Sequence, residues 1–128
     1  MERLRRRAEF LAVAAGTKIP AAAFVVQARQ RDDEGPARVG FTVSKKVGTA
    51  VERNRVRRRL KEAVRRSASP HMRDGHDYVI VGRRAALTVE FARLIGDLEQ
   101  SLARVHKRGH ARRARETASG PMAGESMQ

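Results

Sequence analysis

The chain of 128 residues contains no cysteine and no tryptophan, and its only aromatic side chains are one Tyr and four Phe. Without cysteine, disulfides, Cys-based zinc sites and thiol catalysis are excluded. With so few aromatic side chains, aliphatic residues must fill the core. The apolar runs, such as residues 21–26, are far shorter than the roughly 20 residues that cross a bilayer. We therefore expect a soluble, cytoplasmic protein with no membrane partner.

Acidic side chains are also scarce relative to basic ones. The chain has 28 Lys and Arg against 14 Asp and Glu, which gives a formal net charge of +14. Such an excess repels itself unless an anion neutralises it, and nucleic acid is the polyanion that this balance favours. Only five of the cations are Lys, and the Arg guanidinium that dominates binds phosphate bidentately and stacks on bases. The composition predicts a protein that binds nucleic acid.

The first part of the chain alternates between helical and strand patterns. Residues 5–15 have helix-compatible apolar spacing, and Gly16 is expected to cap that helix. Residues 23–29 and 38–44 alternate as strands do, and the turn formers of residues 32–36 predict an exposed hairpin loop between them. One face of the second strand carries only small or polar side chains, which should leave room for a ligand.

The second part predicts two helices around a strand. Thr49 and Glu52 have capping-box spacing, so a basic helix should run from Ala50 to about residue 67, before Pro70. Residues 78–81 form an apolar, β-branched run typical of a central strand buried on both faces.

The last helix should begin at Thr88 and carry an apolar stripe that ends at Val105. These elements predict an α+β fold, a two-layer α/β sandwich with about four strands and about three helices. Residues 1–106 should form a single RNA-binding domain. Residues 107–128 lose the apolar period and predict a basic, disordered tail.

The basic helix predicted from Ala50 has one apolar face and one wide cationic face. At about 100° per residue, a polar stripe lies opposite the apolar residues. This stripe consists of Asn54, Arg58, Lys61 and Arg65. Between residues 50 and 66, eight cations meet only two acids, so intrahelical ion pairs neutralise few of them. An ordinary solvated charged helix is the alternative, but a surface that follows an RNA backbone explains the excess better.

Two linked motifs make the chain similar to a known family. Residues 41–48 read FTVSKKVG, and residues 53–58 read RNRVRR after Ala50 and Val51. This pattern resembles the signature of the bacterial ribonuclease P protein subunit, and the order of the other elements agrees over about residues 3–106. The resemblance implies a left-handed βαβ crossover that carries the basic helix.

The resemblance also implies a role in tRNA processing. In that family the protein is the accessory subunit of a ribonucleoprotein endoribonuclease, and the RNA subunit is catalytic. The chain would bind ribonuclease P RNA and the 5′ leader of precursor tRNA, and would assist the Mg²⁺-dependent removal of the leader that forms the mature 5′ end. Mg²⁺ would be held mainly by the RNA subunit and substrate. No catalytic residue, protein-bound cofactor or obligate protein partner is expected in this chain.

Two sets of residues are expected to contact RNA. The resemblance, supplemented by the helix geometry for Arg57 and Arg65, gives an RNA-subunit set of Arg53, Asn54, Arg55, Arg57, Arg58, Lys61 and Arg65. A second set, for the leader, would line a cleft between the first helix and the sheet. It comprises Phe10, Phe24, Ser44, Lys45, Lys46, Arg83 and Arg84. Unpaired bases stack on aromatic rings while cations follow the backbone, although both Phe residues could equally belong to the core.

Two other functions remain open from the sequence. Charge and the α/β pattern alone would equally suit a structural RNA-binding protein of the ribosomal type. A self-sufficient nuclease is a third possibility, because four His residues could supply acid and base groups. We expect His71, His76, His106 and His110 to be solvent-exposed and uninvolved in chemistry.

Overall fold

A mixed five-stranded sheet forms the centre of the computed structural model, which describes residues 2–118, with side-chain surroundings for residues 2–67 and 69–108. The strand order is β1-β4-β5-β3-β2. The strands are β1 (Glu2–Arg3), β2 (Thr17–Pro20), β3 (Phe24–Gln30), β4 (Arg38–Thr42) and β5 (His76–Gly82). β4 is parallel to β1 and β5, whereas β3 is antiparallel to β2 and β5.

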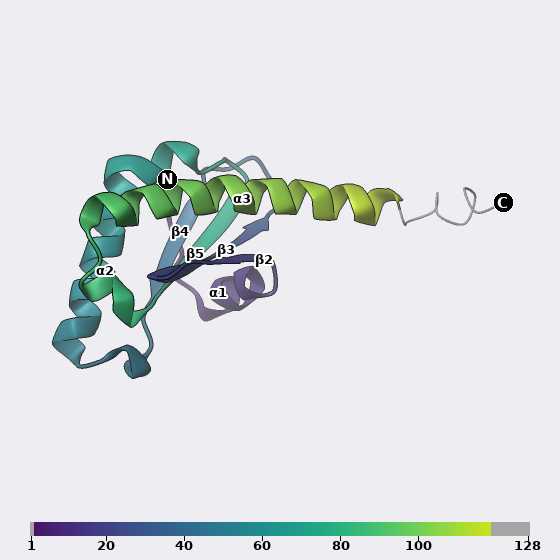
Figure 1. The fold of residues 1–128 in the computed structure, drawn as a ribbon. Coiled ribbons are helices and arrows are strands. Elements are labelled where there is room, and N and C mark those ends of the chain that lie inside the picture. Colours follow the sequence, from purple (N-terminus) through teal and green to yellow (C-terminus); the bar gives the residue numbers. More distant parts are fainter. Residues whose placement is uncertain (1, 119–128) are drawn as a thin grey trace.

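Helices lie on both faces of this sheet (Figure 1). They are α1 (Arg7–Ala14), α2 (Ala50–Ala63) and α3 (Phe91–Ala118), with short turns η1 (Lys45–Val47), η2 (Val64–Ala68), η3 (Ser69–His71) and η4 (Arg84–Leu87). α2 connects the parallel strands β4 and β5, so these three elements form the expected βαβ unit. The α+β class is confirmed, with five strands where about four were expected.

Two apolar clusters hold the layers together. On one face, the stripe Leu94, Leu98 and Leu102 of α3 is completely buried in a cluster that also contains Tyr78 and Phe24 of the sheet. On the opposite face, Leu4 and Val13 pack on Val79, with Phe10 and Val81 at the margin. Each fully buried aliphatic side chain contributes about 2 kcal/mol to folding. The larger cluster lies under α2 and α3, so the orientation of α2 is fixed by the core.

The loop at residues 32–36 is not a hairpin, which corrects the sequence prediction. β3 and β4 do not pair with each other, because each pairs with a different edge of β5. A strand as uniformly apolar as Tyr78–Val81 is most stable at the centre of a sheet, where both its edges are paired. β5 therefore takes the central position, and the loop passes over its end.

Phe10 fills part of the small face of β4. A Cβ atom at Gly40 would lie 2.4 Å from Cε1 of Phe10, so the aromatic ring rests directly on the glycine. The space at Gly40 is therefore occupied, whereas Thr42, on the same face of β4, is half-exposed. Gly16 likewise allows close approach, since a Cβ atom there would lie 2.2 Å from the carbonyl oxygen of Ala28. The residue that caps α1 is Ala15, one position before the glycine expected to do so.

The start of α2 agrees with its sequence signal. The Thr49 hydroxyl accepts a hydrogen bond from the Glu52 amide at 3.2 Å, and Glu52 Oε1 accepts one from the Thr49 amide at 2.9 Å. The helix continues through the wider turn η2 to residue 68, close to the predicted end. Its predicted apolar face is buried, with Val56 and Leu60 at 0% exposure.

α3 is longer than the sequence pattern indicated. The apolar stripe ends at Val105, as predicted, but the helix continues to Ala118. Residues 107–118 are therefore helical, and the boundary expected at residue 107 is not where regular structure ends. Ala and Arg, which dominate this segment, are strong helix formers and extend a helix without a packed face. The rest of the expected tail, residues 119–128, lies outside the described residues.

Two of the histidines are not exposed bystanders. His106 of α3 is half-buried, and its Nε2 is hydrogen-bonded to the hydroxyl of Tyr78, while His76 stacks on the Tyr78 ring. Burial, followed by the charge of Arg73, lowers the pKa of His106 to about 4. Burial raises the pKa of Tyr78 to about 12. His106 is thus neutral at pH 7 and ties α3 to β5, whereas the side chain of His110 lies outside the described set.

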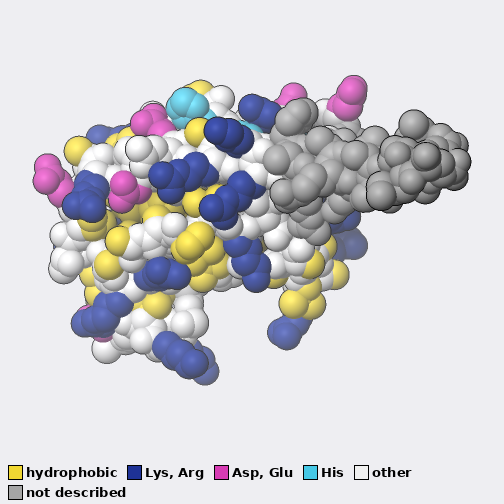
Figure 2. Space-filling model, turned by 45° about the vertical axis from the view of Figure 1, so that its right-hand side comes forward, with side chains coloured by type: hydrophobic (Ala, Val, Ile, Leu, Met, Phe, Trp, Pro, Cys, Tyr) yellow, Lys and Arg dark blue, Asp and Glu magenta, His cyan; other side chains and the backbone are white. Residues whose placement is uncertain are grey.

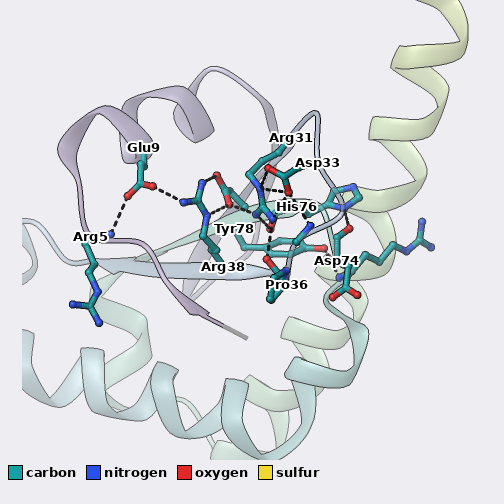
Figure 3. Close-up of polar contacts among 12 residues, drawn as sticks. Arg5, Glu9, Arg31, Asp33, Pro36, Arg38, Asp74, His76 and Tyr78 are labelled. Atoms are coloured by element: carbon teal, nitrogen blue, oxygen red, sulfur yellow. Dashed lines mark hydrogen bonds and ion pairs between the residues drawn. The ribbon is translucent and has the colours of Figure 1, made fainter.

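A buried carboxylate joins three strands at one end of the sheet. Asp77, at 0% exposure, accepts hydrogen bonds from Arg31 Nη1 at 2.6 Å and from Arg38 Nε and Nη2 at 2.8 Å. Arg38 also donates to Glu9 of α1 at 2.6 Å, and Arg31 pairs with Asp33 (Figure 3). Burial alone would raise the pKa of Asp77, but the bonds from Arg38 and Arg31 outweigh it, and the pKa stays below its usual value.

Replacing Asp77 with Asn should destabilise the fold. The substitution keeps the shape but leaves two guanidinium groups without their buried counter-charge, which costs about 3 kcal/mol. Urea unfolding followed by circular dichroism measures the change. Asp33→Asn removes an exposed partner of the same Arg31 and should cost far less. Equal effects of the two substitutions would contradict this account.

Candidate RNA interface

The outward face of α2 carries an open depression of about 390 Å³. Five residues line it, namely Val51, Asn54, Arg57, Arg58 and Lys61. Four of these belong to the predicted RNA-subunit set. Val51, with 75% of its side chain exposed, adds an apolar patch to an otherwise polar, cationic surface. We call this depression the α2 groove.

The polar groups of the α2 groove are partly arranged in advance. Arg57 Nη1 donates to Asn54 Oδ1 at 3.0 Å, which leaves the amide NH₂ group of Asn54 as a donor for a ligand. Nζ of Lys61 lies 6.0 Å from the centre of the Phe41 ring, a cation–π distance. Burial, followed by the charges of Arg3 and Arg57, lowers the pKa of Lys61. An anion in the groove would relieve this repulsion.

Three members of the predicted set lie outside the α2 groove. Arg65 is held by Glu62, whose pKa falls to about 2 because Arg65 and then Arg66 donate hydrogen bonds to it. Arg55 is exposed. Arg53 is half-buried, and its Nε is the buried side-chain polar atom without a hydrogen-bond partner among the described residues. The α2 groove therefore gathers Asn54, Arg57, Arg58 and Lys61 of the predicted set, and these three residues lie outside it.

Arg59 has a structural position that the sequence analysis did not assign. Its guanidinium donates to the carbonyl oxygens of Ala86, at 2.6 Å, and Val89, and it lies 5.9 Å from the centre of the Phe91 ring. Arg66 approaches the same ring at 5.6 Å. Arg59 thus binds α2 to η4 and α3. Its place one turn after the buried residue Val56 was the available signal, since it falls beside the apolar face.

A second group of exposed cations gathers at one end of the sheet. Because β4 and β5 are parallel, the residues that follow them lie at the same end of the sheet. Exposed there are Ser44, Lys45, Lys46, Arg83 and Arg84, all from the predicted leader set. The structure brings these five residues into one region, beside the start of α2.

The five residues differ in how firmly they are held. Arg84 donates to the carbonyl oxygen of Val47 at 2.7 Å and pairs with Glu52 at 3.0 Å. Arg83 donates to the carbonyl oxygen of Ala21 at 2.9 Å. Lys45 and Lys46 lie on the turn η1 with exposed side chains. The two lysines are therefore better placed than Arg84 to bind a mobile ligand.

The two aromatic members of the leader set lie on opposite faces of the sheet. Phe24 is completely buried under α2 and α3, so it is not available to stack on a base. The alternative of a core residue is correct for Phe24, because the alternation of β3 turns it inward with Val26. Phe10 is half-buried on the α1 side.

The sheet beside Phe10 is only partly covered. Val25, Val81 and Thr42 are register partners across three neighbouring strands, and all three are half-exposed. α1 has only eight residues, too few to cover the whole face. We call this region, Phe10 with these three strand residues, the α1-side surface. It provides apolar contact area next to the exposed lysines of η1.

Positive charge extends beyond these two surfaces. Figure 2 shows Lys and Arg side chains distributed across one face of the molecule, with the acidic side chains mostly toward its margins. Within residues 2–118, no helix is long and apolar enough to cross a membrane. Among the described side chains, those of residues 2–67 and 69–108, no group of three or more His, Asp or Glu could hold a metal ion.

Comparison with known proteins identifies the family. The family model described as ribonuclease P matches residues 1–106. The ribonuclease P protein component of Gluconacetobacter diazotrophicus is 52% identical over 108 residues, which cover 84% of this chain and 93% of that protein.

Solved structures agree with this match. The ribonuclease P protein of Thermotoga maritima superposes with a TM-score of 0.69 at 30% identity, covering 82% of this chain and 98% of that one. A Staphylococcus aureus ribonuclease P protein mutant with defective mRNA degradation activity gives 0.61 at 27% identity, covering 82% and 85%. With the family model spanning most of the chain, and a curated relative more than half identical, this chain belongs to the ribonuclease P protein family.

Proposed function

We propose that this chain binds the RNA subunit of ribonuclease P through the α2 groove. The observation that carries the proposal is the groove itself, which gathers Asn54, Arg57, Arg58 and Lys61 around exposed Val51. Guanidinium and ammonium groups bind phosphates, and the Asn54 amide can donate to a sugar hydroxyl or a base edge. RNA displays both kinds of group along its backbone.

We further propose that the 5′ leader of precursor tRNA lies on the α1-side surface and reaches the lysines of η1. A leader is single-stranded, so its bases are free to stack on Phe10 and the apolar strand residues while cations follow its phosphates. Lys45, Lys46, Arg83 and Arg84 are exposed cations at that end of the sheet, and Arg84 is held by Glu52. The leader would then be bound on a different face from the RNA subunit.

In this proposal the chemistry belongs to RNA and Mg²⁺. Mg²⁺ would be held by the RNA subunit and substrate, where it would activate the attacking water. The residues of this chain bind and orient. They bring positive charge to two negatively charged RNAs that repel each other, and so lower the Mg²⁺ concentration needed for assembly. A structural RNA-binding role of the ribosomal type would need the same charge but no leader surface.

Reconstitution tests the proposed function. Added to a bacterial ribonuclease P RNA, the protein should accelerate cleavage of precursor tRNA at low Mg²⁺, measured on a gel as release of the leader. Absence of stimulation would refute the proposal. The protein alone should cleave neither precursor tRNA nor an unstructured mRNA, and cleavage of either would support a self-sufficient nuclease.

Substitutions at neighbouring arginines separate RNA contact from folding. Arg58→Gln should weaken binding of the RNA subunit and reduce the slope of log K against log salt by about one unit, because one phosphate contact is lost. Its unfolding in urea should not change, since Arg58 is exposed. Arg59→Gln is the matched control and should lower stability, because Arg59 anchors η4 and α3. An unchanged salt slope for Arg58→Gln would place that side chain outside the interface.

Lys46→Gln tests the leader surface. The change should weaken binding of precursor tRNA to the assembled holoenzyme by about threefold or more, the effect of roughly one lost phosphate contact. Binding of mature tRNA, which has no leader, should stay the same. Lys46→Arg keeps the charge and should restore most of the affinity. Equal losses for precursor and mature tRNA would contradict this assignment.

A further inference from the structure

The C-terminal part of α3 is a basic helix that extends past the packed core. Val105 is its last buried side chain, and the helix continues to Ala118, about 20 Å further at 1.5 Å per residue. Figure 1 shows this part of α3 projecting beyond the sheet. The matched family model ends at residue 106, so most of the projection lies beyond it. We call residues 104–118 the α3 arm.

The α3 arm is strongly cationic. Residues 104–118 include six cations and one acid, Glu116, and the cations are Arg104, Lys107, Arg108, Arg112, Arg113 and Arg115. The side chains of the first three are exposed. Arg104 and Arg108, like Arg108 and Arg112, are four residues apart, a spacing at which like charges destabilise a helix. The arm therefore has a large excess of positive charge.

The arm begins beside another exposed cation. Arg108 Nη1 lies 3.5 Å from the carbonyl oxygen of Lys18, which places the start of the arm against β2. The side chain of Lys18 is also exposed. β2 is the edge strand on one side of the sheet, and three strand steps, about 14 Å, separate it from β4. The arm therefore lies at the β2 edge of the sheet, away from the α2 groove, which lies near β4.

The composition of the arm distinguishes between classes of partner. After Val105, the apolar residues up to residue 118 are all alanines. Protein–protein interfaces have an apolar centre with large side chains and few charges, which this segment does not offer. Interfaces with nucleic acid are polar and strongly positive, and bind largely through phosphates. The arm fits an RNA backbone.

We propose that the α3 arm, with Lys18 at its base, is a third RNA-binding surface that contacts RNA phosphates at the β2 edge. The RNA is either the RNA subunit or the body of the bound tRNA, since both present the same phosphate chemistry. The proposal rests on the proposed function, because it needs an RNA already held by the α2 groove or the α1-side surface. It adds an RNA contact at the β2 edge of the sheet, where neither of those two surfaces lies.

Paired neutral substitutions in the full-length chain test the arm. One variant carries Lys107→Gln and Arg108→Gln, and a second carries Arg112→Gln and Arg113→Gln. The control carries Arg29→Gln and Arg93→Gln, which removes the same charge from exposed positions outside all three surfaces. Circular dichroism checks that each variant keeps its helix content. Arg112→Lys with Arg113→Lys keeps the charge and serves as the rescue.

Affinity is measured against salt for ribonuclease P RNA alone, and then for precursor tRNA bound to the assembled holoenzyme. For at least one of these RNAs, the salt slope should fall by about one to two units in each arm variant, because each lost phosphate contact removes about 0.7–0.9. The control should change little, and the lysine rescue should keep the wild-type slope. The RNA whose slope changes identifies the source of the phosphates.

If both RNAs give the same slope for the arm variants as for the control, the inference is overturned. This result is distinguishable from failure of the proposed function. In the first case the wild-type protein still stimulates cleavage by the RNA subunit, and in the second it does not.

Discussion

The buried carboxylate of Asp77 is the constraint on which the arrangement of the sheet depends. It sits at the start of the central strand β5 and binds one arginine after β3 and another at the start of β4. Much of the Coulomb energy of a buried ion pair offsets the cost of removing charges from water. Asp77 also fixes the register of β5 with its two neighbours, because a slip of one residue in either pairing would leave a buried charge without a partner. Through Arg38 and Glu9, the same carboxylate also orients α1 over the sheet.

That register determines where the proposed RNA-binding residues lie. With β4 and β5 parallel and in register, the segments that follow them leave the sheet side by side. One segment forms η1 and α2, and the other carries Arg83 and Arg84. The Arg84 side chain forms an ion pair with Glu52 in the first turn of α2, and this pair links the two segments. The two proposed RNA-binding surfaces thus start from one end of one sheet.

Local signals in the sequence predicted the local structure well. The capping box of α2, its buried face and its outward polar stripe all follow from spacing along one helix. The predicted hairpin between β3 and β4 was wrong because both strands pair with β5, which begins more than forty residues after β3 ends. The sequence left Phe24 open between the core and the leader surface, because alternation separates two faces but does not say which face is fully buried. The anchors of Arg59 and His106 were likewise invisible, since their partners lie on other elements.

In the proposed function, the hydrogen-bonded side chains of the α2 groove suit the RNA subunit, and the exposed lysines of η1 suit the leader. The RNA subunit is a constant partner, and Asn54 with Arg57 meets it already hydrogen-bonded, so little side-chain freedom is lost on binding. Leaders differ from one precursor tRNA to another, and phosphate contacts carry no sequence information. Lys45 and Lys46, exposed on a three-residue turn, can reach phosphates of any leader. A prearranged groove for one RNA and adaptable lysines for many follow from the same fold, because α2 packs a whole face on the core, whereas η1 buries only Val47 and leaves both lysines exposed.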